Sequence, residues 1–432
     1  MSQSVNDRRH FLRILSGAAA ATVPASGQAA AAQAVSAAPP VTPRRVGPEH
    51  YVTLGRTGVR VSRVAAGLCL KADDLVASLD AGINYVDTAE KYLNGGHNEM
   101  VGVALKGRDR SKIFISAKFQ DGLQNDLTAT VGEVVARVHK CLERMGTNYI
   151  DCMLIHNVQR VEALGNPVWH EAYQRLKADG KVRFLGASTH DPKLSTIVGA
   201  IVDDSRYDLM LIAFNPTTSG DLYGSTGWPD TPRLVAAAGQ RGLAVATMKI
   251  MVGAVAANAV KGVGKDGYDP NDMAGRGRYL DARIAATRWV LSHPGIQVVQ
   301  YTMTGPETVA AAVEAASTPF TRADVSLARS YHVATIGKAC PIPCPAPCLS
   351  ACPYDVAVPD ILHHRMYYEQ FGLQKQAMLD YQSLRSRAAS ACLTCVAQPC
   401  VRACVESLPV HALLTTSHDV LRLAPPSLRA EE

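Results

Sequence analysis

Short apolar runs alternate with longer amphipathic stretches along most of the chain, beginning near Tyr51. The short runs have the composition of buried strands, and the longer stretches have helical periodicity. The expected strands are Val61–Ala66, Ile83–Thr88, Ile113–Lys118, Tyr149–His156, Val182–Ser188, Leu209–Asn215, Leu243–Lys249 and Ile296–Tyr301. The expected helices include Thr130–Arg144, Trp169–Lys177, Leu194–Val202, Leu280–Leu291 and Glu307–Ala316. Strands that are regularly followed by helices predict a parallel sheet.

Repeated strand–helix units over roughly 250 residues predict an α/β fold, a closed (β/α)8 TIM barrel. The alternative is an open doubly wound sheet, which normally has a glycine-rich fingerprint after its first strand. The turn expected after Val64 contains only Gly67-Leu68-Cys69, which lacks that fingerprint. Before the first strand, the glycine spacing in Leu54-Gly55-Arg56-Thr57-Gly58 predicts a tight hairpin turn at the lower mouth of the barrel.

The amino terminus has the pattern of an export signal. Arg8 and Arg9 precede a mild apolar stretch, and Ala32-Gln33-Ala34 is a suitable cleavage site. This pattern resembles a twin-arginine signal, so we expect export, most simply to the periplasm. The alternative is a disordered Ala-rich leader on a cytoplasmic protein. Residues 1–48 are accordingly assigned to a signal and a proline-containing linker.

Composition and charge narrow the classes of partner. The net charge is +6 without a dense basic block, so nucleic acid is not expected as the main partner. No apolar run is long enough, and free enough of charged residues, to form a stable membrane span. Cysteine is concentrated between Cys340 and Cys404. We therefore expect a barrel over residues 49–325 and a separate Cys-rich domain over residues 326–432.

Four polar residues fall at or just after consecutive strand ends, where TIM barrels place their reactive groups. Asp87, Lys118 and His156 lie near the ends of the second, third and fourth strands, and Tyr92 lies in the loop after Asp87. Singly, each could be a helix cap, a packing residue or a surface residue. Because a buried unpaired Asp or Lys is costly, we expect the four to converge in an active site.

This set of residues suits reduction of a carbonyl by hydride. The hydride adds to carbon, so the oxygen gains negative charge and needs a proton. Tyrosine has a pKa of roughly 10 in water. We expect the Lys118 ammonium, held by Asp87, to lower the pKa of Tyr92. His156 would orient the carbonyl through a hydrogen bond to its oxygen.

The same segments resemble the aldo-keto reductase family. Its signature is similar to the run Asn84-Tyr85-Val86-Asp87-Thr88-Ala89-Glu90-Lys91-Tyr92. Its lysine and histidine segments resemble Ser116-Ala117-Lys118 and Asp151-Cys152-Met153-Leu154-Ile155-His156. The resemblance extends from about Val52 to Phe320 and implies that Tyr92 is the proton donor. It also implies that Lys118 and Asp87 tune that donor and that His156 orients the substrate.

The resemblance further implies a nicotinamide cofactor bound without a Rossmann loop. Gly186-Ala187-Ser188 resembles the step that meets the nicotinamide amide, although Thr189 stands where the family usually has Asn. Asn215 and Lys249 fall where the family lines its cofactor cleft. The stretch Met303–Glu307 lacks the basic residues of NADP-dependent members, so both NAD and NADP stay open. The implied substrate is a small carbonyl compound or alcohol, with sugars among the candidates.

The cysteine tail contains two spaced groups. They are Cys340-x3-Cys344-x3-Cys348-x3-Cys352 and Cys392-x2-Cys395-x4-Cys400-x3-Cys404. Three close thiolates and a distant fourth resemble two-cluster ferredoxins, in which the fourth cysteine of each group serves the other cluster. We expect a small, mainly helical, ferredoxin-like domain with two 4Fe-4S clusters. The gaps are wider than usual, and disulfides and two zinc sites are the alternatives.

Two classes of function follow. The first is an aldo-keto reductase-type oxidoreductase that transfers a hydride between a nicotinamide and a carbonyl–alcohol pair, with an iron–sulfur domain and an electron-transfer partner. The second is a non-enzymatic electron-transfer or binding protein whose barrel is inactive. The filled set of Asp87, Tyr92, Lys118 and His156 favours the first.

Overall fold

The computed structural model describes residues 45–119, 129–217, 230–251, 273–335, 340–342, 344–370 and 372–423. The chain divides between Thr42 and Pro43 into two units, and every described residue belongs to the second. The predicted export signal, with Arg8 and Arg9, lies outside the described residues.

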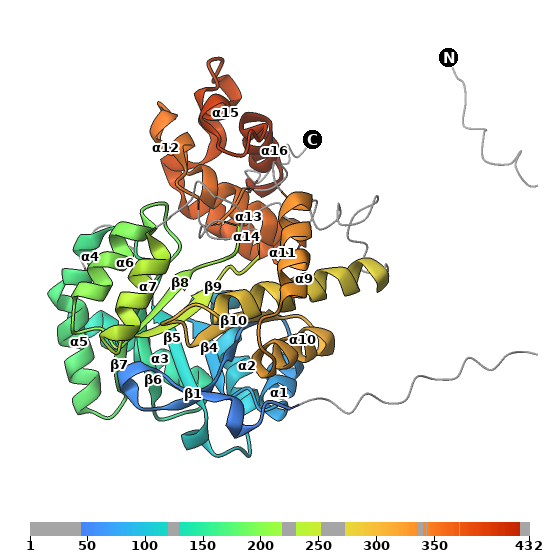
Figure 1. The fold of residues 1–432 in the computed structure, drawn as a ribbon. Helices are drawn as coiled ribbons and strands as arrows, with labels where there is room; N and C mark the ends of the chain where they lie inside the picture. Colours follow the sequence, from blue (N-terminus) through green and yellow to red (C-terminus); the bar gives the residue numbers. More distant parts are fainter. Residues whose placement is uncertain are drawn as a thin grey trace, which may run out of the picture. The chain divides into compact units, whose positions relative to one another are not determined.

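Eight parallel strands form a closed barrel in the order β10-β3-β4-β5-β6-β7-β8-β9 (Figure 1). Their bounds are β3 Val64–Cys69, β4 Tyr85–Ala89, β5 Phe114–Phe119, β6 Ile150–Ile155, β7 Val182–Thr189, β8 Leu209–Ala213, β9 Ala244–Met248 and β10 Val298–Met303. The register places Asp87 opposite Ser116 on the next strand, and Ser116 opposite Cys152. Each predicted strand has a counterpart, so the TIM-barrel prediction is confirmed.

Helices surround the barrel, and α3 shows how the sequence sets their limits. The Thr130 side chain accepts from the backbone N–H of Glu133, whose carboxylate accepts from the N–H of Thr130. This capping box satisfies N–H groups that would otherwise lack partners at the helix start. The barrel helices are α1 Ala72–Asp80, α2 Gly96–Leu105, α3 Val131–Met145, α4 Val161–Gly165, α5 Pro167–Ala178, α6 Leu194–Asp203, α7 Thr231–Gln240, α9 Met273–Leu291, α10 Pro306–Ser317 and α11 Arg322–Thr335.

A hairpin precedes the barrel, as predicted. It pairs β1 Tyr51–Thr53 with β2 Arg60–Ser62 in antiparallel fashion, and its turn buries Leu54 completely. The predicted strand Val61–Ala66 is wrong in one respect, because it spans parts of β2 and β3, which are interrupted at Arg63. There the chain leaves the hairpin for the barrel wall. The residues predicted as a turn, Gly67 to Cys69, belong to β3.

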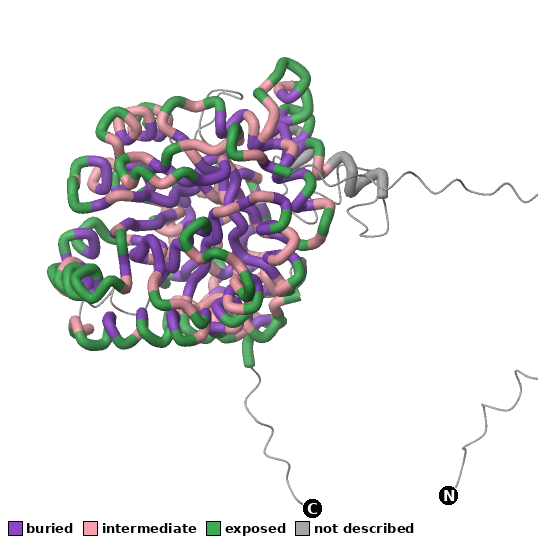
Figure 2. Tube along the Cα trace, turned by 90° about the horizontal axis from the view of Figure 1, so that it is seen from below, coloured by how far each residue is buried: buried purple, intermediate pink, exposed green. Residues whose placement is uncertain are grey.

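The barrel strands are buried on both faces. Their outward side chains pack with the helices in one apolar cluster, and inward side chains such as Tyr85, Phe114 and Leu209 form another. Figure 2 shows buried segments at the centre and exposed segments around them. This explains why the strands have nearly continuous apolar sequences instead of alternating ones.

The described residues from Cys340 to Leu423, here called the Cys-rich region, are helical and have a core of their own. Leu362, Tyr381 and Leu414 are buried in that core. The helices, drawn from orange to red in Figure 1, are α12 Pro347–Ala351, α13 Val358–Gln370, α14 Gln374–Ser383, α15 Pro399–Ala403 and α16 Val410–Leu421. The predicted helical C-terminal region is therefore present.

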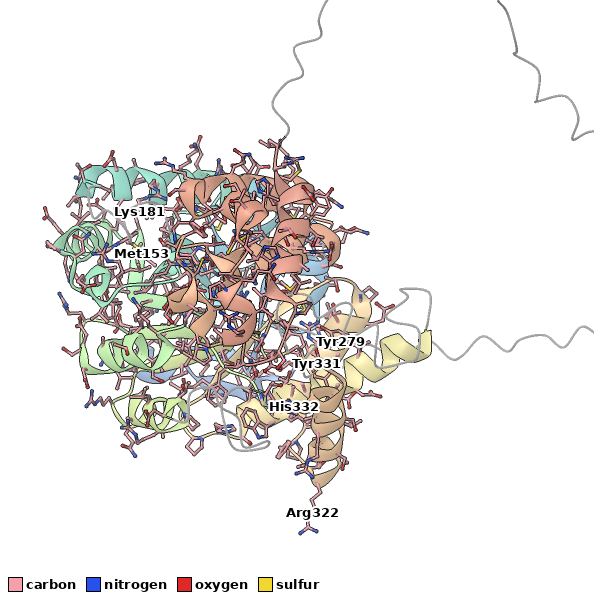
Figure 3. All side chains as sticks on the ribbon, turned by 90° about the horizontal axis from the view of Figure 1, so that it is seen from above. Met153, Lys181, Tyr279, Arg322, Tyr331 and His332 are labelled. Atoms are coloured by element: carbon pink, nitrogen blue, oxygen red, sulfur yellow. The ribbon has the colours of Figure 1, made fainter. Side chains whose placement is uncertain are left out.

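Helix α11 joins the two parts of the chain and packs against α9. Arg288 of α9 forms an ion pair with Asp324 of α11 at 2.9 Å. Figure 3 shows Tyr331 and His332 near Tyr279 of α9, while Arg322 at the start of α11 points away. The predicted domain boundary after residue 325 falls inside this helix. Among the helices described, none is long and apolar enough to cross a membrane.

Candidate active site

Asp87 and Lys118 form the buried centre of the candidate site, at the C-terminal ends of β4 and β5. The Lys118 ammonium and the Asp87 carboxylate form an ion pair, and each residue is 1% exposed. Ser116 donates its hydroxyl hydrogen to the other carboxylate oxygen of Asp87 at 2.6 Å. A buried ion pair needs such extra hydrogen bonds to offset the loss of hydration.

Tyr92 and His156 lie beside this pair. The Lys118 Nζ is 4.8 Å from the centre of the Tyr92 ring, and the His156 and Tyr92 ring centres are 6.0 Å apart. The turn after Tyr92 is strained, because Leu93 and Asn94 have φ of 53° and 55°. Such strain persists where the surroundings hold a residue in place. The structure thus brings together the four residues selected from the sequence.

The pKa values in the site differ in one respect from the sequence-based expectation. Burial raises the pKa of Tyr92, the Asp87 carboxylate raises it further, and only a hydrogen bond with Gln300 lowers it. The direction is the reverse of the one expected from Lys118, because burial has the largest effect on the Tyr92 pKa. Burial, and then the charge of Lys118, lowers the pKa of His156 well below its usual value, so His156 is neutral near pH 7.

Gln300 on β10 is a site residue that the sequence did not reveal. Its Nε2 donates to the Asp87 carboxylate at 2.6 Å, and its side chain lowers the pKa of Tyr92. It reaches Asp87 past Gly67 on the neighbouring strand. A Cβ atom at Gly67 would lie 2.4 Å from Gln300 Nε2, so the glycine leaves room for this side chain. Gln300 therefore links Asp87 to Tyr92 across the barrel.

We expect Gly67→Ala to reduce turnover roughly tenfold and to lower the free energy of unfolding by about 1.5–3 kcal/mol. The new methyl group displaces the flexible end of Gln300 and breaks its bond to Asp87. A hydrogen bond to a charged group contributes about 1.5–3 kcal/mol. Steady-state kinetics and thermal unfolding measure the two effects. Gln300→Leu, which breaks the same bond, should match it, whereas wild-type turnover in Gly67→Ala would argue against a role for Gln300.

The residues expected to contact the cofactor lie near the ends of β7, β8 and β9. Ser188 is fully buried, and its Oγ accepts from the backbone N–H of Asn157 at 2.9 Å. Asn215 Nδ2 donates to the carbonyl oxygens of Lys249 and Ile342, at 3.0 Å each. Lys249 Nζ donates to His363 Nε2 at 3.0 Å. Two of the three residues thus contact the Cys-rich region.

Lys249 lies among histidine side chains at the mouth of the barrel. Burial, with a smaller contribution from the charge of Lys118, lowers the pKa of Lys249 to about 7. Burial and nearby lysines also lower the pKa of His364 to about 4, and burial lowers that of His190 to about 3. The histidines around Lys249 are therefore uncharged near neutral pH.

The eight clustered cysteines form two sets of neighbouring thiols. The first set lines a small pocket with an open volume of about 340 Å³. It consists of three cysteines of the first group and the last cysteine of the second group: Cys340, Cys344, Cys348 and Cys404. In the second set, the pKa of the Cys392 thiol is raised to about 11, by burial first and then by Cys352, Cys400 and Cys395. The last cysteine of each group therefore lies with the other group.

All eleven cysteines are free thiols in the structure. In the part of the chain that the structure describes, no three Cys, His, Asp or Glu side chains are placed to hold a single metal ion. A second pocket, a cleft with an open volume of about 1010 Å³, lies between the barrel loops and the Cys-rich region. Its walls include His190 and Asp191 from the barrel and Cys344, Asp360 and His363 from the Cys-rich region. Cys344 therefore borders both pockets.

Parts of the chain match known proteins. The chain is 28% identical over 174 residues to the uncharacterized oxidoreductase YqkF of Bacillus subtilis, covering 36% of this chain and 56% of that protein. It is 33% identical over 121 residues to an aldo-keto reductase of a Mycobacterium species, covering 28% and 41%. The chain thus spans about half the length of these relatives.

Solved structures match a larger share of the chain. The holo form of aldo-keto reductase AKR11C1 from Bacillus halodurans has 21% identity and a TM-score of 0.48, and the match covers 65% of this chain and 95% of that one. The family described as Aldo/keto reductase family matches residues 70–212. That stretch contains Asp87, Tyr92, Lys118 and His156, but not Gln300 or the clustered cysteines. Residues 70–212 of the barrel thus match the model of the Aldo/keto reductase family.

Proposed function

We propose that this protein is an oxidoreductase that interconverts a small carbonyl compound and the corresponding alcohol. One observation carries the proposal: Asp87, Tyr92, Lys118 and His156 meet at the mouth of the barrel, inside the stretch that matches the aldo/keto reductase family. Sugars are one class of compound that contains both groups.

Each of these residues has a role that follows from its surroundings. Burial keeps the Tyr92 hydroxyl protonated, so it can give a proton to the substrate oxygen during reduction or receive one during oxidation. Lys118 then stabilises the phenolate that proton transfer creates. Neutral His156 can donate a hydrogen bond to the same oxygen. Asp87 positions Lys118, and Gln300 positions Asp87 and Tyr92.

A nicotinamide would supply or accept the hydride in this chemistry. The donor set at the mouth fits such a group in kind: the hydroxyl of Ser188, the carboxamide of Asn215 and the ammonium of Lys249 suit an amide and phosphates. His156 also has a buried Nδ1 for which the described residues provide no hydrogen-bond partner. Ser188, Asn215 and Lys249 are therefore the residues that would hold the cofactor, whether NAD or NADP.

We also propose that the Cys-rich region holds two 4Fe-4S clusters. Support comes from the two thiol sets, each made of three cysteines of one group and the last cysteine of the other, as in two-cluster ferredoxins. A four-iron cluster separates its cysteine sulfurs more widely than a single ion does. The clusters would exchange electrons with a partner protein, and the paired arginines support export of the loaded, folded chain.

The thiol sets predict the effect of a single substitution. Because Cys404 lies with Cys340, Cys344 and Cys348, Cys404→Ser should impair the first cluster and leave the second intact. Protein purified without oxygen should contain about eight iron atoms per chain, and the variant about half as many. Iron analysis and electron paramagnetic resonance measure this. Full iron content in the variant, or none in the wild type, would contradict the assignment.

The proposed function is tested by assaying the purified, oxygen-free protein with NADH and NADPH against aldehydes, ketones and sugars, and with the oxidised cofactors against alcohols. We expect turnover that depends on Lys118, so Lys118→Met should be inactive. Lys193→Met, which changes an exposed lysine after β7, serves as the control. A lack of turnover by the wild type in both directions would refute the proposed activity.

A further inference from the structure

Helix α13 of the Cys-rich region lies against the part of the barrel mouth where a nicotinamide would bind. His363 of α13 is 7% exposed and accepts a hydrogen bond from Lys249 Nζ at 3.0 Å. Its ring also stacks on that of His190 from the loop after β7, with ring centres 5.9 Å apart and planes inclined by 22°. The contact therefore joins α13 to two barrel loops.

A second contact from the same region occupies Asn215. Its carboxamide nitrogen carries two hydrogens, and Nδ2 donates to the carbonyl oxygens of Lys249 and Ile342. Its Oδ1 accepts from the backbone N–H of Thr217 at 3.0 Å. Asn215 is 1% exposed, so water does not reach it easily. While Ile342 is in place, both N–H donors of Asn215 are engaged within the chain.

We propose that the Cys-rich region and a nicotinamide compete for Asn215 and Lys249, so that the cofactor binds only when Ile342 and α13 withdraw from the mouth. The inference rests on the proposed function for the competing ligand and for its contacts with Asn215 and Lys249. The competition itself rests on the two contacts, and binding can be measured without turnover.

The chemistry of the contact allows such a withdrawal. The groups that meet are an ammonium, an imidazole, a carboxamide and a backbone carbonyl, and each can exchange its partner for water. The cleft of about 1010 Å³ lies along this contact and is lined by His190, Asp360, His363 and Arg387. Water in the cleft can therefore replace the broken hydrogen bonds as α13 moves.

The test compares nicotinamide binding by the full-length protein and by His363→Ala, with NADH and NADPH as probes and calorimetry as the readout. The variant removes the acceptor for Lys249 and the ring that stacks on His190. We expect its Kd to be roughly tenfold lower than that of the wild type. The control is Glu369→Ala, which lies on the same helix but pairs with Arg365. Its Kd should match that of the wild type.

Hydrogen exchange of the wild type provides a readout that needs no variant. Saturating NADPH should speed amide exchange in α13 and around Ile342 if the cofactor displaces them. Equal Kd values for wild type and His363→Ala, or slower exchange in α13 with cofactor, would overturn the proposal. So would an absence of binding to both, because removing the contact should open the site. Competition without any turnover would instead refute the proposed function and leave this inference intact.

Discussion

Turnover should fall by a factor of roughly 10²–10⁴ when Tyr92 is replaced by phenylalanine, the range that a positioned general acid contributes. The substitution removes the hydroxyl that gives or takes the proton but keeps the ring 4.8 Å from the Lys118 ammonium. The substitution leaves the partly buried ring of residue 92 in place. Folding should therefore be nearly unchanged. Steady-state turnover and thermal unfolding of the two proteins measure these effects.

A second tyrosine provides the matched control. Tyr149 precedes β6 at the opposite end of the barrel, where the Arg110 guanidinium lies 4.0 Å from its ring centre. Tyr149→Phe removes the same hydroxyl group and should retain wild-type turnover. Equal losses in both variants would point to a general effect on folding, and full activity of Tyr92→Phe would show that another group moves the proton.

Asp87→Leu should be the most destabilising substitution in the site, by about 3–5 kcal/mol. The carboxylate accepts hydrogen bonds from Ser116 and Gln300, at 2.6 Å each, and balances the charge of Lys118. Without it, a buried ammonium has no counterion. Urea unfolding of wild type and variant measures the difference in the free energy of unfolding.

Two further measurements separate this cause from poor packing. The double variant Asp87→Leu, Lys118→Met should recover much of the lost stability, because it removes the unpaired charge as well. Burial lowers the pKa of Lys118, and Asp87 opposes that shift, so the single variant lowers the pKa further. Between this folded-state pKa and the higher unfolded one, stability rises with pH. The deficit of Asp87→Leu should therefore shrink as pH rises, and a deficit independent of pH would contradict the charge argument.

The barrel and its four polar residues could be predicted because their signals are local. Each strand is a short apolar run, and Asp87, Lys118 and His156 interrupt or end such runs where a barrel places its chemistry. The break at Arg63 could not be seen, because the residues on both sides of it are suitable for strands. The hairpin and the first barrel strand therefore merged into one predicted element.

The parts of the site that were missed depend on contacts between distant segments. Gln300 resembles an ordinary polar residue in a strand, and only the closure of the barrel brings it past Gly67 to Asp87. His363 lies 114 residues after its partner Lys249 in the sequence. The visible signal was the adjacent pair His363 and His364, but the sequence does not indicate which residues they contact. The direction of the Tyr92 pKa was missed because burial outweighs the nearby lysine.

The exchange of Cys352 and Cys404 between the two thiol sets has a consequence for biosynthesis. When synthesis has passed Cys352, only three of the four thiols that line the first pocket have been made, because Cys404 is still to come. The second set also waits for Cys400, which follows α13 and α14 in the chain. Neither set is complete until Cys400 and Cys404 have been made, so all eight barrel strands are synthesised before either set of thiols is whole.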